Sequence, residues 1–246
     1  MNRILVDELE YKVNGNTFII DIKSDTNIFI NSALHNYIIN VYDSKVNILA
    51  IISDKKSLNV KFNLYSSNMV FNLITNETIE NKIEAYLYDK LSVFTMYNSV
   101  IAKEDTVADI NVFHKANNTK SYVYNFGVSK DNGSINFNVI SKVSKKYSGC
   151  ILKQDSKIIS LNNTNNNIIN PVLLIDNYDT EGAHAAFIGK FNEEEVFYLQ
   201  SKGIKKSDAY KLLLEGFLIG VMDIDDHEKE SLKEKFNIDW RWYKWM

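Results

Sequence analysis

Short runs in which apolar and polar residues alternate fill most of this chain and restrict what it can fold into. Such runs occupy residues 17–22, 58–64 and 134–139, and similar ones recur up to residue 188. Alternation with a period of two is typical of β-strands that bury one face. Polar segments separate the runs, for example at residues 130–133, and no helical pattern of ten or more residues interrupts them. Residues 1–191 are therefore predicted to form an all-β body.

Two all-β architectures can hold so many short strands. One is a sandwich of two antiparallel sheets, and the other is a solenoid in which each turn of the chain stacks on the last. A strict repeat would favour the solenoid. The strand centres are instead spaced irregularly, roughly 10 to 12 residues apart, which also suits a sandwich. The alternation alone leaves both architectures open.

The pattern changes to helices at Asn192, after which the only further asparagine is Asn237. Asn192 and the three glutamates that follow it have the composition of a helix N-cap and first turn. This helix is predicted to run to Lys202, with Gly203 as a left-handed residue after it. A helical subdomain of residues 192–246 is therefore predicted to follow the β-body.

A second helix is predicted over residues 208–221, capped by Ser207 and Asp208, and a charged third helix over residues 226–236. The second helix is apolar on more than one face, so it should have neighbours on both sides, from this chain or from another subunit. The C-terminal end of the chain carries Trp240, Trp242 and Trp245. Such a tail suits an interface and a packed C-terminus equally well.

Composition narrows the class of protein. The formal net charge is −3 and the only arginines are Arg3 and Arg241, which disfavours nucleic acid as a partner. No signal-peptide core and no apolar stretch of membrane-spanning length is present, so a cytoplasmic protein is expected. The single cysteine, Cys150, agrees with a reducing compartment and is expected to be a small buried residue. No phosphate-binding loop or hydrolase motif occurs, so no enzymatic activity is predicted.

The C-terminal third resembles the segment that closes proteins of the SufB/SufD family. The residues concerned are HAAFIGKFNEEEVFYLQSKGI (184–204), then LEGF (214–217), with NPVLLI (170–175) as the strand upstream. The resemblance implies a right-handed parallel β-helix for the body, in a short form without the helical N-terminal region common in the family. It also implies a scaffold for iron–sulfur cluster assembly, with a SufC-like ATPase on the C-terminal helices and a SufB-like protein or a second copy as a further partner.

We expect the ATPase contact on the first two helices and their connecting turn, with Tyr210 and Phe217 as the main anchors. The full set predicted to bind this partner is Phe197, Tyr198, Lys202, Gly203, Ile204, Tyr210, Leu213, Leu214 and Phe217.

The metal chemistry implied by the resemblance centres on His184. SufB proteins carry a glutamate after this histidine, whereas this chain has Ala185, and Cys150 does not match the SufB cysteine position. The chain is therefore interpreted as SufD-like. His184 is a candidate metal ligand, although a lone histidine at the end of a strand more often caps or packs. Since one cysteine and scattered histidines are too few, the isolated chain is expected to hold no stable cluster, and any transient iron or cluster would be shared with a partner.

Two other functions remain open on the sequence. A β-helix could be an exported carbohydrate-active enzyme whose carboxylates do acid–base work. The absence of a signal and of arginine between Arg3 and Arg241 disfavours this reading. A purely structural interaction protein is the second alternative.

Overall fold

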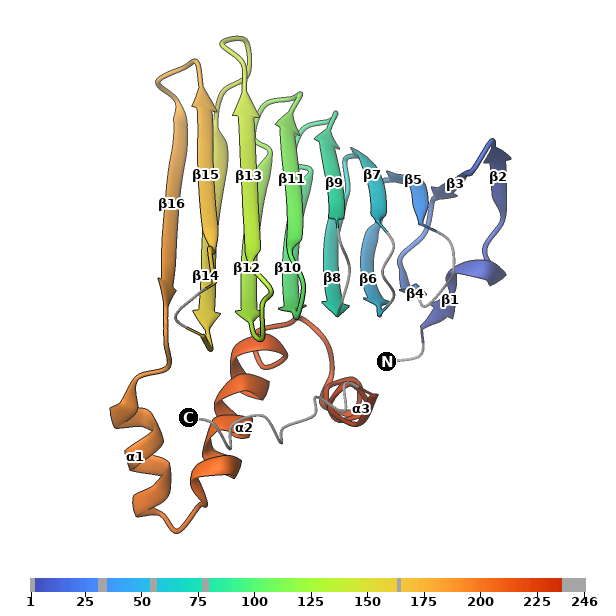
Figure 1. Cartoon of the computed structure of the whole chain (residues 1–246). Coiled ribbons are helices and arrows are strands. Elements are labelled where there is room, and N and C mark those ends of the chain that lie inside the picture. Colours follow the sequence, from blue (N-terminus) through green and yellow to red (C-terminus); the bar gives the residue numbers. More distant parts are fainter. Residues whose placement is uncertain (1–2, 31–34, 54–56, 77–79, 163–164, 236–246) are drawn as a thin grey trace.

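The computed structural model describes residues 3–30, 35–53, 57–76, 80–162 and 165–235. The chain coils into a solenoid of about six turns with three short helices near its C-terminus (Figure 1). Its strands form two eight-stranded sheets, which face each other across the core. The predicted solenoid is confirmed, and the sandwich is excluded because successive turns pair in parallel.

From β3 onward, successive strands of the chain alternate between the two sheets. Sheet A consists, in spatial order, of β1 (Ile4–Leu5), β4 (Thr26–Ile30), β6 (Lys45–Ile52), β8 (Asn68–Asn76), β10 (Val93–Ala102), β12 (Lys120–Ser129), β14 (Cys150–Ser160) and β16 (Thr180–Gly189). Sheet B consists, in spatial order, of β15 (Ile168–Ile175), β13 (Ile135–Val143), β11 (Thr106–His114), β9 (Glu80–Leu87), β7 (Leu58–Tyr65), β5 (Asn36–Tyr42), β3 (Thr17–Ile22) and β2 (Tyr11–Asn14).

The turns lengthen along the chain, and this explains the irregular strand spacing. In sheet A, Thr26 pairs with Val46, Asn68 with Val93, and Lys120 with Ile151, so one turn takes 20, then 25, then 31 residues. The strands lengthen with the turns, and the solenoid widens toward its C-terminal end (Figure 1). A fixed sequence period therefore does not exist, although every turn is stacked in register on its neighbour.

The interior of the solenoid is mainly Ile, Val, Leu and Phe, as alternation predicts. Asparagine lies on both faces of the sheets, however, whereas alternation alone would place it only on the outer face. Outside, Asn40 donates to Asp21 and Asn63 donates to Asn40, both at 2.7 Å. Inside, the fully buried Asn98 donates to Asn125 at 3.0 Å, and Asn125 donates to Ser156 Oγ at 2.9 Å. Stacked turns place identical amides one above the other, so each amide can satisfy the next.

Three helices follow the solenoid: α1 (Glu193–Ser201), α2 (Lys206–Leu218) and α3 (Asp226–Lys235). The predicted N-cap is confirmed, because the Asn192 side chain accepts the Glu194 N–H at 3.0 Å. Gly203 has φ +86°, as expected for the left-handed residue after α1. The predicted cap of the second helix was wrong by two residues: α2 has Lys205 at its N-cap, without a side-chain hydrogen bond.

Helices α2 and α3 pack on the outer face of sheet A and form a second apolar core with it. Leu214, Leu218 and Leu232 are buried there against side chains of five strands, including Ile101 and Phe126. Polar side chains of the sheet fix the connecting segment, since Ser99 Oγ donates to the Leu218 carbonyl at 2.6 Å. The apolar second helix therefore has its neighbours within the chain. Sheet A and α3 cover its apolar side chains, so they are not left exposed beside the solenoid. The predicted end of the third helix at residue 236 and the tryptophan tail lie outside the described residues.

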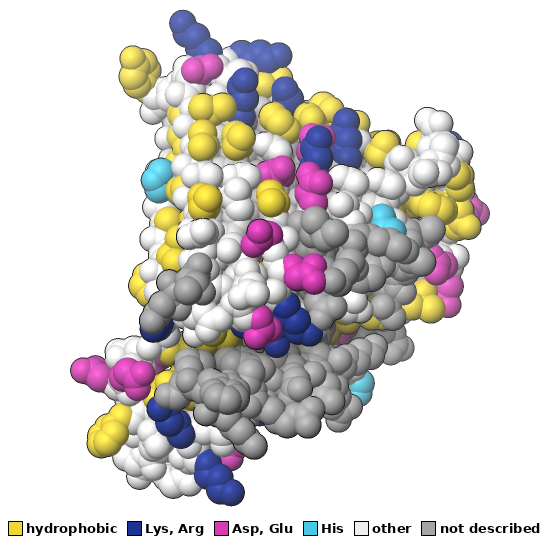
Figure 2. All heavy atoms as spheres, in the orientation of Figure 1, with side chains coloured by type: hydrophobic (Ala, Val, Ile, Leu, Met, Phe, Trp, Pro, Cys, Tyr) yellow, Lys and Arg dark blue, Asp and Glu magenta, His cyan; other side chains and the backbone are white. Residues whose placement is uncertain are grey.

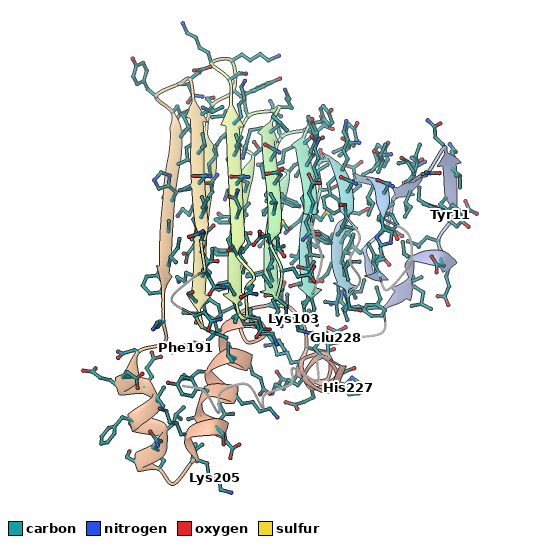
Figure 3. The ribbon with its side chains drawn as sticks, in the orientation of Figure 1. Tyr11, Lys103, Phe191, Lys205, His227 and Glu228 are labelled. Atoms are coloured by element: carbon teal, nitrogen blue, oxygen red, sulfur yellow. The ribbon has the colours of Figure 1, made fainter. Side chains whose placement is uncertain are left out.

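The N-terminus is clamped to the same helices. The guanidinium of Arg3 donates to Glu228 on α3, with Nε–Oε1 at 2.5 Å and Nη2–Oε2 at 3.1 Å. It also donates to the Asn47 carbonyl at 2.9 Å. Glu228 accepts the Asp225 N–H as well, which makes it part of the α3 capping box (Figure 3). Because both charged side chains are almost buried, this pair ties the first turn of the solenoid to the last helix.

Candidate functional site: the open end of the solenoid and the helical hairpin

The last turn of the solenoid, formed by β15 and β16, is largely uncovered. Almost every residue of β16 is exposed, whereas inward positions of the preceding strands are buried. The exposed side chains include large apolar ones: Ile168, Val172, Leu174, Phe187 and Ile188. Figure 2 shows apolar side chains along this margin of the molecule. We call the surface of β15 and β16 the open end.

The open end also carries unpaired backbone. Among the described strands, β16 pairs only with β14 and β15 only with β13. Each of these edges is long, since β16 has 10 residues and β15 has 8. Exposed, apolar parallel edges of this length are sites where another strand can add, unless they are covered. The open end therefore has the geometry of a sheet edge to which a further strand could add.

His184 lies in the middle of β16, rather than at the end of a strand as its sequence context had suggested. It is exposed and pairs in register with Gln154 of β14. Gln154 Nε2 donates to Ser141 Oγ at 2.9 Å and to the Val172 carbonyl at 3.2 Å, while its buried Oε1 has no partner. A polar, incompletely satisfied position thus lies in register with His184 in the middle of the open end.

The other residues with metal-binding side chains are not gathered around His184. Cys150 is buried, as expected, and pairs in register with Thr180 rather than with His184. Its Sγ lies 3.4 Å from Thr119 Oγ1. Over the described ranges, no group of three or more His, Cys, Asp or Glu side chains is placed to hold a metal. A metal ion at His184 would therefore need further ligands from outside this part of the chain.

A buried histidine near Cys150 was missed at the sequence level. His114 Nδ1 lies 2.7 Å from Thr119 Oγ1, and its Nε2 lies 2.9 Å from Ser121 Oγ. Since the Thr119 hydroxyl donates to the Ala116 carbonyl, it accepts from Nδ1–H, and Nε2 is left to accept from Ser121. Burial lowers the pKa of His114 from 6.5 to about 4. His114 is thus a neutral core residue, and its two partners lie just after it in the chain, where β11 leads into β12.

Helices α1 and α2 form a hairpin that extends away from the solenoid, with Lys205 at its tip (Figure 3). Of the residues predicted to bind a partner, Phe197 and Tyr198 are 72% and 61% exposed. Lys202 and Gly203 are also exposed, and Lys202 Nζ lies 5.4 Å from the ring centroid of Tyr198. This side of the hairpin presents aromatic rings to solvent.

The remaining predicted contacts lie deeper in the hairpin. Tyr210 and Leu214 are buried, while Ile204, Leu213 and Phe217 are half-buried. The Phe217 ring packs edge-on against Phe126, with centroids 5.3 Å apart. Tyr210 and Phe217, expected as the main anchors, are therefore part of the packing that holds the hairpin. Burial also raises the pKa of Tyr210, and Glu193 adds to this shift.

A groove runs along the hairpin where β16 passes into α1. It consists of two adjoining cavities of about 450 and 390 Å³ that share Asn192, Glu195 and Leu213. Phe187, Phe191, Leu212 and Phe217 line the larger cavity, and Tyr198 and Glu194 the smaller one. We call this the hairpin groove.

No helix in the described parts of the chain has the length and hydropathy needed to cross a bilayer.

The sequence is similar to proteins of one known family. The family model "SUF system FeS cluster assembly, SufBD core domain" matches residues 28–217. The iron–sulfur cluster assembly protein SufD of Bacillus subtilis is 34% identical over 112 residues, which cover 46% of this chain and 26% of that protein. A SufBD family protein of Staphylococcus saprophyticus is 29% identical over 176 residues, covering 62% of this chain and 37% of the relative.

The SufB protein of B. subtilis is 27% identical over 175 residues, again 62% of this chain and 37% of the relative. The chain thus spans between 26% and 37% of the length of these relatives. The family model covers both the solenoid from β4 onward and the hairpin, which are the two parts that build the open end and the groove. On this evidence the chain belongs to the SufBD family of the SUF system for iron–sulfur cluster assembly.

Proposed function

We propose that this chain is a non-catalytic, SufD-like scaffold subunit of a cytoplasmic SUF-type complex that assembles iron–sulfur clusters. In this proposal the open end pairs with a SufB-like protein or with a second copy, and the hairpin binds a SufC-like ATPase. The observation that carries the proposal is the open end itself. A family member whose last turn exposes two long strand edges and several large apolar side chains has a surface that needs a second subunit.

Pairing at the open end gives His184 a role that the isolated chain does not supply. Addition of a partner strand along β16 would place the partner's side chains next to His184, because neighbouring strands lie about 4.8 Å apart. The exposed imidazole could then share iron or a nascent cluster with ligands of the partner. The cluster is cargo in this scheme. This chain contributes one ligand and the surface on which the other ligands are assembled.

The proposed ATPase contact uses the exposed aromatic side of the hairpin. Phe197 and Tyr198 project from α1, and the Gly203 turn leaves the tip of the hairpin accessible. Aromatic residues that become buried at the centre of an interface usually dominate its affinity. The buried Tyr210 and Leu214 would support this contact by holding α2 in place, and their truncation would act on stability.

Copurification from cells that contain the SUF partners tests the proposal. We expect the tagged chain to retain an ATPase subunit together with a SufB-like chain or a second copy. Replacement of both Phe197 and Tyr198 by alanine should lower retention of the ATPase at least about tenfold without unfolding the chain, since both side chains are exposed. Leu91→Ala is the matched control, because Leu91 is 71% exposed and lies outside the hairpin. Wild-type retention of the ATPase by the double variant would refute the assigned contact.

Iron binding needs a separate measurement. The isolated chain should purify colourless and hold at most weakly bound iron, whereas the complex with a SufB-like partner should develop cluster absorbance on reconstitution. His184→Ala should reduce that absorbance without changing the amount of complex. A stoichiometric cluster on the isolated chain would contradict the shared-ligand scheme.

A further inference from the structure

Tyrosine rings from successive turns of the solenoid stack on one another along sheet B. Tyr42 ends β5 and Tyr65 ends β7, and the two residues are partners in register. Their rings are parallel within 7°, with centroids 4.8 Å apart. Tyr88 directly follows β9 and continues the stack, at 5.3 Å and 14° from Tyr65. Three turns thus contribute one phenol each to a single stack, which we call the tyrosine column.

The backbone corners hold the column in place. The residue after each of its first two tyrosines is not glycine but has a left-handed φ, +47° and +48° respectively. A buried serine then closes each corner. Ser44 Oγ donates to the Tyr42 carbonyl at 2.6 Å, and Ser67 Oγ donates to the Tyr65 carbonyl at 2.7 Å. The Ser44 N–H donates to Ser67 Oγ at 3.3 Å and links the two corners. The register of the rings is therefore fixed by the turns themselves.

The column can be reached from solvent. Tyr88 is 36% exposed, and Tyr42 and Tyr65 are half-buried. Burial raises the pKa of Tyr65, and the neighbouring Tyr42 and Tyr88 raise it further, so its hydroxyl is protonated at neutral pH. An oxidant that removes an electron from this ring therefore also releases a proton and leaves a neutral phenoxyl radical. Tyr86 lies 5.8 Å from Tyr88 at 11° and adds a further phenol to the same face.

Stacked phenols can be joined by a balanced one-electron chemistry. Hydroxyl radicals, formed from ferrous iron and hydrogen peroxide, are a sufficient oxidant: each takes one electron and one proton from a phenol and becomes water. Two phenoxyl radicals on adjacent rings then form a carbon–carbon bond between the ring carbons next to their oxygens. The protons on these carbons move to the two oxygens, so the product, dityrosine, has two hydrogens fewer than the two tyrosines. Rings in offset-stacked contact are already positioned for this bond.

A second stacked pair on sheet A provides an internal comparison. Tyr97 and Tyr124 are partners in register, with ring centroids 5.2 Å apart at 14°. Both rings pack against the apolar core that α2 and α3 form with this sheet. The helices therefore limit the access of an oxidant to this pair, although its ring geometry is similar to that of the tyrosine column.

We propose that Tyr42, Tyr65 and Tyr88 form an oxidation site, at which one-electron oxidants join successive turns of the solenoid through dityrosine bonds. The bond forms most readily between Tyr42 and Tyr65, whose rings are the closest and most nearly parallel in the column. The column thus intercepts radicals outside the core and converts them into a covalent link between two turns. The inference does not depend on the proposed scaffold role, because its test uses this chain alone.

Treatment of the full chain with ferrous iron and limiting hydrogen peroxide tests the site. Dityrosine is measured by its fluorescence, excited beyond the absorption of tryptophan, and located by mass spectrometry of tryptic peptides. Lysines separate the three tyrosines, so trypsin places each of them on a different peptide. We expect a link from Tyr65 to Tyr42 or Tyr88 within one chain, at a yield that does not depend on protein concentration.

Two variants separate stacking from exposure. Tyr65→Phe keeps the central ring but removes its hydroxyl, so it should keep the fold and remove most of the dityrosine fluorescence, although the chain has 14 tyrosines. Tyr178→Phe is the matched control, because Tyr178 is fully exposed in a turn, and it should leave the yield unchanged.

Each other outcome would overturn the inference. An oxidised wild-type chain without dityrosine would refute the site outright. Dityrosine that persists in Tyr65→Phe, in a chain with wild-type circular dichroism and melting temperature, or that maps to Tyr97 and Tyr124, would place the reaction elsewhere. Links that form only between chains, or a yield that falls in Tyr178→Phe, would show that exposure rather than stacking selects the reacting rings.

Discussion

The two ends of the solenoid are built differently. At the N-terminal end the edge strands are short, since β1 has 2 residues and β2 has 4, and β2 turns back to pair antiparallel with β3. Val6 is buried beneath this end, and Arg3 clamps it to α3. At the C-terminal end, β15 and β16 are long, parallel and exposed. Solenoids require caps at both ends, and no described residue caps β15 and β16, which is why we propose this end as the surface that another chain covers.

The interior of the solenoid changes in the same direction. The turn formed by β5 and β6 buries only apolar side chains at its inward positions, such as Ile39 and Ile48. Toward the open end the inward positions become polar, with Asn125, Gln154 and Ser156 among them. Buried polar groups add specificity only when their hydrogen bonds are completed. The core of the narrow end is thus apolar, which favours stability. The core of the wide end contains polar side chains as far as the open end, which a partner would cover.

The clamp at the closed end should give the largest effect on stability. Glu228→Gln keeps an oxygen for the Asp225 N–H but leaves Arg3 without its countercharge. Breaking one side of a buried ion pair lowers the free energy of unfolding by about 3 to 5 kcal/mol. Urea denaturation should show a loss in this range with partner binding unchanged. Glu230→Gln is the control, because Glu230 is exposed on the same helix and pairs with Lys233. Equal losses for the two variants would show that the clamp does not secure this end.

His114 should make the wide half of the solenoid sensitive to acid. Its pKa is about 4 in the folded chain and 6.5 when unfolded, so only the unfolded state takes up this proton between these values. The stabilisation is complete above pH 6.5 and falls as the pH drops, by about 3 kcal/mol at pH 4. His114→Gln should flatten the dependence of unfolding free energy on pH in this window. An unaltered slope in His114→Gln would contradict the burial of a neutral imidazole.

A lysine at each end compares the two surfaces directly. Ile188→Lys at the open end should weaken pairing with a SufB-like partner, or self-association, by about 2 kcal/mol, a factor of roughly 30. The same change at Val13, which is exposed on β2, should leave pairing as it is. Both positions face solvent in the isolated chain, so both variants should melt like the wild type. Sedimentation velocity at several concentrations measures this difference. Stronger weakening by Val13→Lys would reverse the assignment of the two ends.

The external amide ladders should give the smallest effect. Asn138 donates to Asp109 at 2.7 Å and accepts from Asn170 at 2.9 Å, whereas Asn63 donates only to Asn40. At about 0.5 kcal/mol for each half-exposed hydrogen bond, Asn138→Ala should lower the free energy of unfolding by about 1 kcal/mol and Asn63→Ala by about half of that. Urea denaturation of both variants under the same conditions checks the ratio. A larger loss at Asn63 would mean that the ladders do not act through these bonds.

Local patterns in the sequence predicted local structure well. The strands at residues 17–22 and 58–64, the cap at Asn192, the left-handed Gly203 and the burial of Cys150 all follow from propensity and alternation. Alternation fixes which face a residue occupies but not which residue of the next turn lies beside it. Because the turns grow from 20 to 31 residues, no fixed period could reveal the stacked amides.

The candidate site was predictable only in part for the same reason. The residues of the hairpin were found from the sequence, but their exposure was not. The packing of α2 on sheet A buries Tyr210 and Leu214 and leaves Phe197 and Tyr198 outside. The Arg3–Glu228 pair joins residues 225 positions apart, a separation at which no local pattern exists.

Hydrogen exchange of the backbone amides at the two ends offers the most direct test of where a partner binds. In the isolated chain, the amides of β16 that do not bond to β14 should exchange rapidly, as those of an open edge do. After addition of a SufB-like partner we expect slowed exchange across residues 180–189 and no change across residues 11–14. Formation of a complex with β16 still exchanging freely, or with protection at β2 instead, would contradict the assignment of the open end as the pairing surface.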